Sequence, residues 1–449
     1  MPGQKITETC TLSAETGRAA RPDPRAKFIR QFGRDCSGGI AIMAALLMPV
    51  LTLGLGLGAE TGYYYMTQRN LQNAADLAAH AGAVRLRAGD DEAAIRAAAL
   101  HVAKAAGFVE SDGFFDVNVP PETGPNTGNP ASVEVLVTKS QTRFFSAIIN
   151  SEPVLINARA VANVFSSGSS ACVLALSRTD SRAVTVSGST DVSLDGCDVA
   201  SNSNASDAFW MSNSSARLTV DCIQSVGGTV SNHQLILQEC AAPKENAPVV
   251  RDPYADLAEP ETSIPCESNV NVSVFNPTQP HPSGMPAMRI CGGLDIKSKV
   301  VFNPGLYIID GGDLTMNANG DVSSADVGLT ADGVTFFLKG TSTLKFNGNG
   351  NLNIQSPSSG PYAGILFFAS RSQTGLTHEI RGNFGSTAQG ALYAPTSAIS
   401  FSGNSTATNG CTQIIGLTVE FTGNSTLRSS CSTENGRIIE TNVSVRIVE

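Results

Sequence analysis

The longest uninterrupted apolar run of the chain covers residues 38–59 and contains no charged side chain. A helix rises about 1.5 Å per residue, so this run reaches about 33 Å, enough for a hydrocarbon core about 30 Å thick. The pattern therefore predicts a transmembrane helix between Gly38 and Ala59. The alternative is the apolar region of a cleaved secretory signal, but such regions are shorter, and cleavage after Ala59 would need a small residue where Leu57 stands.

The charges on the two sides of this run predict its orientation. Arg69 is the only cation in the window after the run, whereas six basic residues precede it: Arg18, Arg21, Arg25, Lys27, Arg30 and Arg34. By the positive-inside rule the N-terminus stays in the cytoplasm and the rest of the chain lies outside. The residues predicted to mark the membrane boundaries are Arg34, Gly38, Ala59, Glu60 and Tyr63, the last being the first of three tyrosines suited to the headgroup level.

Beyond the boundary the pattern indicates a stem helix and a small α+β, pilin-like unit over residues 60–165. Small residues recur at intervals of three or four on one helical face, namely Leu71, Ala74, Ala75, Ala78, Ala81 and Gly82. A second helix is predicted for residues 90–106, because an acidic first turn precedes an apolar stripe and Gly107 follows it. Strands are expected at residues 114–119, 133–138, 143–149 and 154–164.

From residue 166 onward, short β-prone runs alternate with Gly, Asn and Ser turns. These runs lie at residues 183–186, 216–220, 334–338, 343–346, 364–368 and 399–401. FSGNST at 401–406 recurs as FTGNST at 421–426, twenty residues later. Such a repeat predicts the stacked coils of a parallel β-solenoid, with a β-sandwich as the alternative. The Pro-rich stretch 241–283 interrupts the pattern and is expected to be a long loop or a packed linker.

Composition narrows the class of protein. The net charge is −9, and no basic patch follows the apolar run, so no nucleic-acid partner is expected. Cys10 and Cys36 fall on the predicted cytoplasmic side. The candidate disulfide cysteines outside are Cys172, Cys197, Cys222, Cys240, Cys266, Cys291, Cys411 and Cys431. Their even number suits an oxidising compartment, and pairing of sequence neighbours is the simplest of the possible connectivities.

Residues for catalysis, cofactors or metals do not stand out. Asp310 and Asp313 could present carboxylates to Ca²⁺, but a tight turn around the two glycines between them explains the same residues. The sequence has no C-x-x-C zinc pair, no G-x-S-x-G elbow and no phosphate-binding P-loop, and His233, His281 and His378 stand apart. We therefore predict no catalytic, cofactor-binding or metal site, and a protein that is not an enzyme.

Residues 33–86 resemble the N-terminal anchor of TadG-like proteins of the tight-adherence (Tad) pilus machinery. The shared features are a basic lead with glycine, Pro49 within the apolar run, an acid at Glu60 followed by Gly62 and tyrosines, and an Ala-rich helix. The family usually has Asp where Glu60 stands. The segment FNPGLYIIDGGDL at 302–314 is also similar to TadG-like proteins. Some relatives end in a von Willebrand type A domain, whose Asp-x-Ser-x-Ser metal motif this sequence lacks.

The resemblance implies a single-pass protein of the bacterial inner membrane that acts in the assembly or anchoring of Flp pili. Its expected layout is a cytoplasmic tail (1–37), the membrane helix (38–59), the stem with the small unit (60–165), and a periplasmic or envelope-exposed β region (166–449). Its expected partners are other pilus-assembly proteins or pilin-like subunits. Two alternatives remain, a carbohydrate-acting β-solenoid enzyme, which needs Asp, Lys or Arg clustered on neighbouring coils, and a surface adhesin.

Overall fold

The structure is a computed structural model. It describes residues 39–166, 170–194, 196–317, 320–324, 333–348, 351–382, 388–402, 406–407, 412–423, 426–429, 437–441 and 443–449. The contacts divide the chain into two compact units. The first comprises the described part of Met1–Gln68 together with Ser140–Ile156, and the second comprises Arg69–Lys139 together with Asn157–Glu449.

The predicted membrane helix and the predicted stem form one continuous helix, α2 (Gly39–Ala88). Its apolar part is long and apolar enough to cross a membrane, and almost none of that part is buried within the protein. Further along, within the second unit, one face of α2 is buried as the small-residue pattern predicts. The buried residues of this face are Leu71, Ala74, Ala75, Ala78, Ala79, Gly82 and Ala83, whereas Ala81 is half-buried.

The small unit contains a second helix and a four-stranded sheet. Helix α3 (Glu92–Ala105) lies within the predicted range, and its N-cap Asp91 accepts a hydrogen bond from the Ala94 amide at 2.8 Å. A 3-10 turn, η1 (Glu110–Asp112), follows α3. The sheet has the order β1-β2-β3-β31 and consists of β1 (Gly113–Asn118), β2 (Ser132–Gln141), β3 (Val154–Ser166) and β31 (Val443–Ile447).

One predicted strand of this unit is wrong. Residues 143–149 contain a 3-10 turn, η2 (Ser146–Ile148), in place of a strand. The sequence RFFSAII has apolar pairs on both sides of Ser146 without a strict alternation, so its periodicity does not distinguish a strand from a helical turn. Backbone N–H groups at Phe144 and Ser146 bond to a side chain of α2, so no sheet partner is needed for them.

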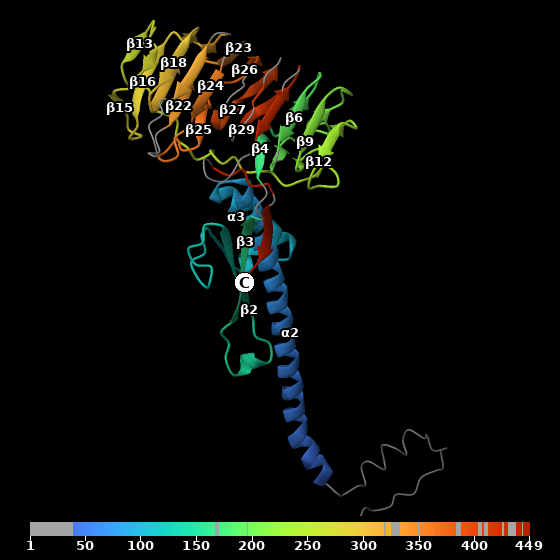
Figure 1. Cartoon of the computed structure of the whole chain (residues 1–449). Helices are drawn as coiled ribbons and strands as arrows, with labels where there is room; N and C mark the ends of the chain where they lie inside the picture. Colours follow the sequence, from blue (N-terminus) through green and yellow to red (C-terminus); the bar gives the residue numbers. More distant parts are fainter. Residues whose placement is uncertain are drawn as a thin grey trace, which may run out of the picture. The chain divides into compact units, whose positions relative to one another are not determined.

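The region from β4 onward consists mostly of short strands that pair in parallel, in long rows (Figure 1). The first row runs in the order β13 (Cys266–Ser268), β16 (Pro286–Cys291), β19 (Gly305–Asp310), β22 (Val334–Lys339), β25 (Ile365–Ala369), β27 (Ala388–Ser402), β29 (Thr412–Phe421), β4 (Ala171–Ala175), β7 (Asp198–Ser201) and β10 (Ile223–Ser225). Short β15 (Gln279–Pro280) adds an antiparallel pair to β16.

A second parallel row follows the first. It runs through β17 (Leu294–Ile296), β20 (Leu314–Met316), β23 (Leu344–Gly348), β26 (Thr377–Gly382), the later parts of β27 and β29, β5 (Val184–Val186), β8 (Phe209–Met211) and β11 (Thr229–Ser231).

The remaining strands form two shorter parallel rows. One has β14 (Val274–Phe275), β18 (Lys299–Phe302), β21 (Asp321–Ser324) and β24 (Asn351–Gln355), which pairs with the start of β27. The other has β28 (Thr406–Ala407), β30 (Thr426–Ser429), β6 (Asp191–Leu194), β9 (Arg217–Val220) and β12 (Leu235–Leu237).

The path of the chain through these rows is not sequential. The chain enters at β4, beside β29, and proceeds through β7 to β10 at one end. Residues 241–265 then lead to β13 at the opposite end, from which the strands return to β29 (Figure 1). Tyr254, Leu257 and Ile264 of this stretch are buried in an apolar cluster with side chains of the first row. Part of the Pro-rich stretch 241–283 is therefore packed against the rows, whereas its later part forms strands β13, β14 and β15.

Inner strands of the first row, such as β19, β22, β25 and β4, are buried on both faces, whereas β13 at the end of the row is exposed. In β19, Tyr307 and Ile309 belong to the larger apolar cluster, and Leu306 and Ile308 belong to the cluster covered by the linker. Burial on both faces explains why these strands read as continuous apolar runs and do not alternate with polar residues. The internal repeat is also in register, since Phe401 of β27 pairs with Phe421 of β29 and their rings stack.

Candidate functional site

The apolar part of α2 exposes large side chains all around the helix. Leu46, Val50 and Leu55 are among the most exposed apolar residues of the protein, and Pro49 lies within the helix without ending it. The single hydroxyl of this stretch, Thr52 Oγ1, donates to the carbonyl oxygen of Met48 at 2.9 Å. The helix therefore satisfies that polar group internally, as a hydrocarbon environment requires.

The polar end of this stretch is organised by Glu60, which is only 3% exposed. Its carboxylate accepts hydrogen bonds from the amide nitrogens of Phe144 (3.0 Å) and Ser146 (2.7 Å) and from Ser146 Oγ (2.8 Å). The Tyr64 hydroxyl, one helical turn away, also donates to it. Glu60 is thus not a lone exposed acid at the boundary but the residue that binds the β2–β3 connection to α2.

A glycine one turn before Glu60 completes this contact. Gly56 is buried, and a Cβ added there would lie 2.6 Å from Cδ1 of Phe145. The phenyl ring therefore occupies the space that a side chain at position 56 would fill. Tyr63 adds an edge-to-face contact with Phe144, with ring centroids 5.7 Å apart.

The other residues predicted to mark the membrane boundaries add little to this description of the site. Ala59 is exposed and Tyr63 is 45% exposed. Arg34 and Gly38 lie outside the described residues, as do Cys10, Cys36, Cys411 and Cys431. The spacing of Gly56 and Glu60, four residues apart on one helical face, is a signal that could have indicated a docked segment.

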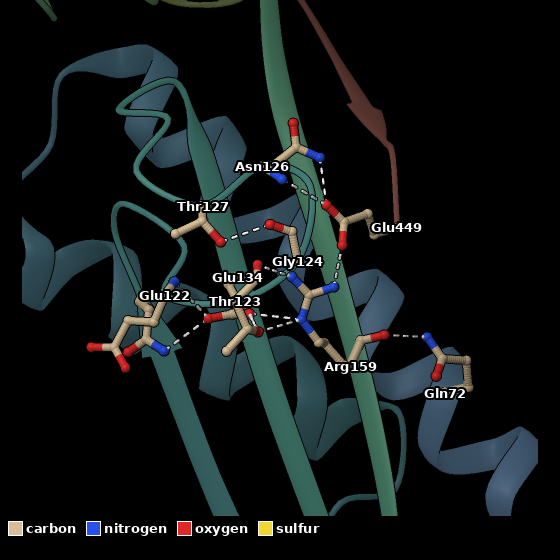
Figure 2. Close-up of polar contacts among 10 residues, drawn as sticks. Gln72, Glu122, Thr123, Gly124, Asn126, Thr127, Glu134, Arg159 and Glu449 are labelled. Carbon is tan, nitrogen blue, oxygen red and sulfur yellow. Dashed lines mark hydrogen bonds and ion pairs between the residues drawn. The ribbon is translucent and has the colours of Figure 1, made fainter.

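A second polar cluster, which sequence reasoning missed, lies in the small sheet. Glu134 is fully buried and accepts hydrogen bonds from Thr123 and from Arg159 (2.7 Å), as Figure 2 shows. It also accepts one from Asn118 at 3.0 Å. Arg159 also forms an ion pair with Glu449. Burial by itself would raise the pKa of Glu134, but these hydrogen bonds lower it to about 2. The cluster ties the loop after β1 to strand β3 and to Glu449.

Asp310 and Asp313, the predicted carboxylate pair in the β region, both bond to basic side chains. Asp310 accepts hydrogen bonds from Arg289 (2.6 Å) and Lys339 (3.0 Å), and Asp313 accepts one from Lys345 (2.6 Å). Burial acts to raise the pKa of Asp310, but the two cations lower it below its ordinary value. Among the described residues, no three His, Cys, Asp or Glu side chains are placed to hold a metal ion. The turn interpretation therefore suits Asp310 and Asp313 better than a calcium site.

Among the residues that the structure describes, three disulfides join neighbouring segments of the β rows. They link Cys172 with Cys197, Cys222 with Cys240, and Cys266 with Cys291, at sequence separations of 25, 18 and 25. These are the neighbour pairings that the sequence suggests. The Cys172–Cys197 bond joins β4 to the start of β7, and the Cys266–Cys291 bond joins β13 to β16, so each connects adjacent parallel strands.

Comparison with known protein families finds a match for the N-terminal part of the chain. Residues 38–100 match the Tad family model, described as "Putative Flp pilus-assembly TadE/G-like". This confirms the resemblance for a segment that covers the membrane-length part of α2, its stem and the first part of α3, and it relates the chain to Flp pilus assembly. No curated protein and no solved structure matches the chain.

Proposed function

From the match of residues 38–100 to a pilus-assembly family, we propose that this protein is a membrane-anchored structural or accessory component of Flp pilus assembly, without enzymatic activity. The observation that carries the proposal is that the matched segment is a helix long and apolar enough to span a bilayer, which continues as a stem packed on a folded unit. The helix fixes the location, and the small unit presents a surface to pilin-like partners.

The proposed location is the bacterial inner membrane, with the N-terminus in the cytoplasm and the β region in the periplasm or envelope. The basic residues before α2 favour this orientation. The three disulfides support it, since such bonds form and persist in oxidising compartments.

We further propose that the β region is a solenoid that acts as a stiff spacer or interaction surface. The support for this is the parallel pairing of successive strands in rows with a constant order. The Phe401–Phe421 stack, in register across the repeat, supports the same arrangement. Each added coil then covers the open edge of the one before it, which is how stacked repeats gain stability.

The proposed orientation in the membrane can be tested by labelling the native cysteines. In intact spheroplasts, a membrane-impermeant maleimide should fail to label Cys10 and Cys36 until the membrane is permeabilised. After reduction, Cys266, which is exposed on β13, should react without permeabilisation. Labelling of Cys36 in intact spheroplasts would contradict the proposed orientation.

The role in pilus assembly is tested by deleting residues 38–59. The expected result is a soluble outer region and loss of piliation, while replacement of the segment by an unrelated apolar span restores membrane location and separates anchoring from sequence-specific contacts. Normal pili in the deletion strain would count against the proposal.

The enzyme alternative keeps one supporting observation, because Arg289, Asp310 and Lys339 do cluster on neighbouring strands. Arg289 and Lys339 each form an ion pair with Asp310, which favours a structural role. Polysaccharide cleavage by the purified protein that is lost in Asp310→Asn would support the enzyme. Binding of the isolated protein to cells or glycans would support the adhesin.

A further inference from the structure

The connection between β2 and β3 carries a concentrated apolar surface. Residues 144–149, called the apolar tip below, expose Phe144, Phe145, Ile148 and Ile149, with the two isoleucines 83% and 80% exposed. Leu155 nearby is also exposed. Contiguous apolar surface of this kind marks a site of contact with a protein or a membrane.

The tip is held beside the apolar part of α2, within the same compact unit. Glu60 binds the amides of Phe144 and Ser146, and Phe145 lies against Gly56. Gly56 belongs to the membrane-length segment, and Glu60 marks its polar end. With a rise of about 1.5 Å per residue, Phe145 lies about 6 Å deeper along the helix than the carboxylate that holds the tip.

The backbone of the tip is suited to an environment with little water. The amides of Phe144 and Ser146 bond to Glu60, and the amides of Ile149 and Asn150 both bond to the Ser146 carbonyl oxygen at 3.0 Å. Three N–H groups of the tip, and that of Asn150 directly after it, are thus satisfied within the protein. Polar backbone that enters a bilayer must be satisfied in this way, because the hydrocarbon offers no partner.

Polar groups flank the tip where the headgroups would lie. Arg143 Nε donates to the Glu152 carbonyl oxygen at 2.7 Å, and Asn150 and Glu152 are exposed. A half-exposed guanidinium beside exposed aromatic rings is a combination typical of the membrane–water interface.

We propose that the apolar tip is a second membrane-contact element, which inserts Phe144, Phe145, Ile148 and Ile149 into the outer part of the bilayer that α2 spans. The inference rests on the proposed anchoring of α2. The occupant is lipid because the apolar surface of the tip is continuous with the lipid-length surface of the helix and lies at the same level along it. Insertion would fix the rotation and depth of α2, since the helix is then held at two points.

The test uses the full chain in liposomes, with Cys10 and Cys36 replaced by serine and one new cysteine labelled with the environment-sensitive dye NBD. The three label positions are made by Ile148→Cys in the tip, Val50→Cys in the span and Ser111→Cys on η1. Quenching is measured with doxyl-labelled lipid and with aqueous iodide.

We expect the dyes at positions 148 and 50 to be quenched severalfold more by doxyl lipid than by iodide, and the dye at position 111 to show the reverse. Lipid quenching at 50 with iodide quenching at 148 would overturn the tip proposal and leave the anchor intact. Iodide quenching at 50 would overturn the anchor and the tip together. A dye at 148 shielded from both quenchers would show a protein partner and overturn the lipid assignment.

A second measurement guards against a local effect of the dye. The pair Ile148→Ser and Ile149→Ser keeps every hydrogen bond of Glu60 to the tip. In liposomes it should raise hydrogen exchange in residues 141–156 severalfold, whereas Leu155→Ser, which lies outside the tip, should raise it less in the same liposomes. Unchanged exchange in the double variant would refute insertion.

Discussion

His378 allows the packing of the β region to be tested by pH. The imidazole is fully buried on β26, and the Leu344 amide donates to its Nδ1 at 3.1 Å. The proton of the neutral ring therefore lies on Nε2, for which the described residues supply no acceptor. Burial lowers the pKa of His378 from 6.5 to about 4, although the charge of Asp313 acts in the opposite direction.

The sign of the pH effect follows from this lowered pKa. Between pH 6.5 and 4 the unfolded chain binds a proton at this position and the folded chain does not, so stability falls as the pH falls through this window. The interval from 6.5 to about 4, at about 1.4 kcal/mol per pH unit, corresponds to a loss of about 3 kcal/mol in the free energy of unfolding. Below pH 4 both states are protonated, and this contribution changes no further.

The assay is denaturant unfolding of the full chain in detergent, followed by the fluorescence of Trp210, the only tryptophan, which lies on β8 of the same parallel row. His378→Asn keeps an acceptor oxygen near the position of Nδ1 and cannot be protonated. It should be less stable than the wild type at pH 7 and should lose the extra decline between pH 6.5 and 4. The exposed His233→Asn is the matched control and should follow the wild type.

The refuting result is specific. If His378→Asn and the wild type show parallel pH dependence over this window, then the buried ring is either protonated in the folded state or hydrated there. The comparison uses the slope of the free energy of unfolding against pH, so a constant loss of stability caused by the smaller side chain does not affect it. Carboxylates that titrate in both proteins contribute equally to both slopes and cancel.

Three further outcomes are expected. Gly56→Leu should displace the phenyl ring beside it and raise hydrogen exchange in residues 143–149 at least tenfold, whereas Gly58→Leu, where a Cβ meets no atom within 4 Å, should leave that exchange unchanged; equal effects would refute the contact. Cys172→Ser together with Cys197→Ser should cost about 3 kcal/mol of stability, measured by denaturant unfolding, because the bond closes a loop of this length; a loss near zero would show that the pair is not bonded. Glu134→Gln should cost about 2 kcal/mol, since it leaves a partly exposed guanidinium without its buried carboxylate, and should raise amide exchange in residues 122–126; unchanged exchange there would contradict the role given to this cluster.

Local pattern predicted several strands of the β region. The run at 334–338 became β22 and the run at 364–368 became β25, because strands buried on both faces must be continuously apolar. The repeat at 401 and 421 predicted neighbouring parallel strands, and the two phenylalanines stack in register. These features depend on residues close together in the sequence, so composition and spacing were sufficient.

Long-range partners could not be obtained in this way. Nothing near β4 in the sequence indicates that its neighbour is β29, more than 200 residues later, or that residues 241–265 lead from one end of the rows to the other. The ion pairs of Asp310 follow from the register of β16, β19 and β22 and not from any motif.

The sequence by itself determined a membrane-length apolar helix, its continuation as a stem with a small-residue face, and cysteines spaced for neighbour pairing. Each of these features depends only on side chains that lie close together in the sequence. Only the tertiary structure decided that Glu60 is buried, because its donors come from residues 84 and 86 positions further along the chain. The same contact turned a predicted strand into the apolar tip, since a carboxylate on α2 satisfied amides that would otherwise have required a neighbouring strand.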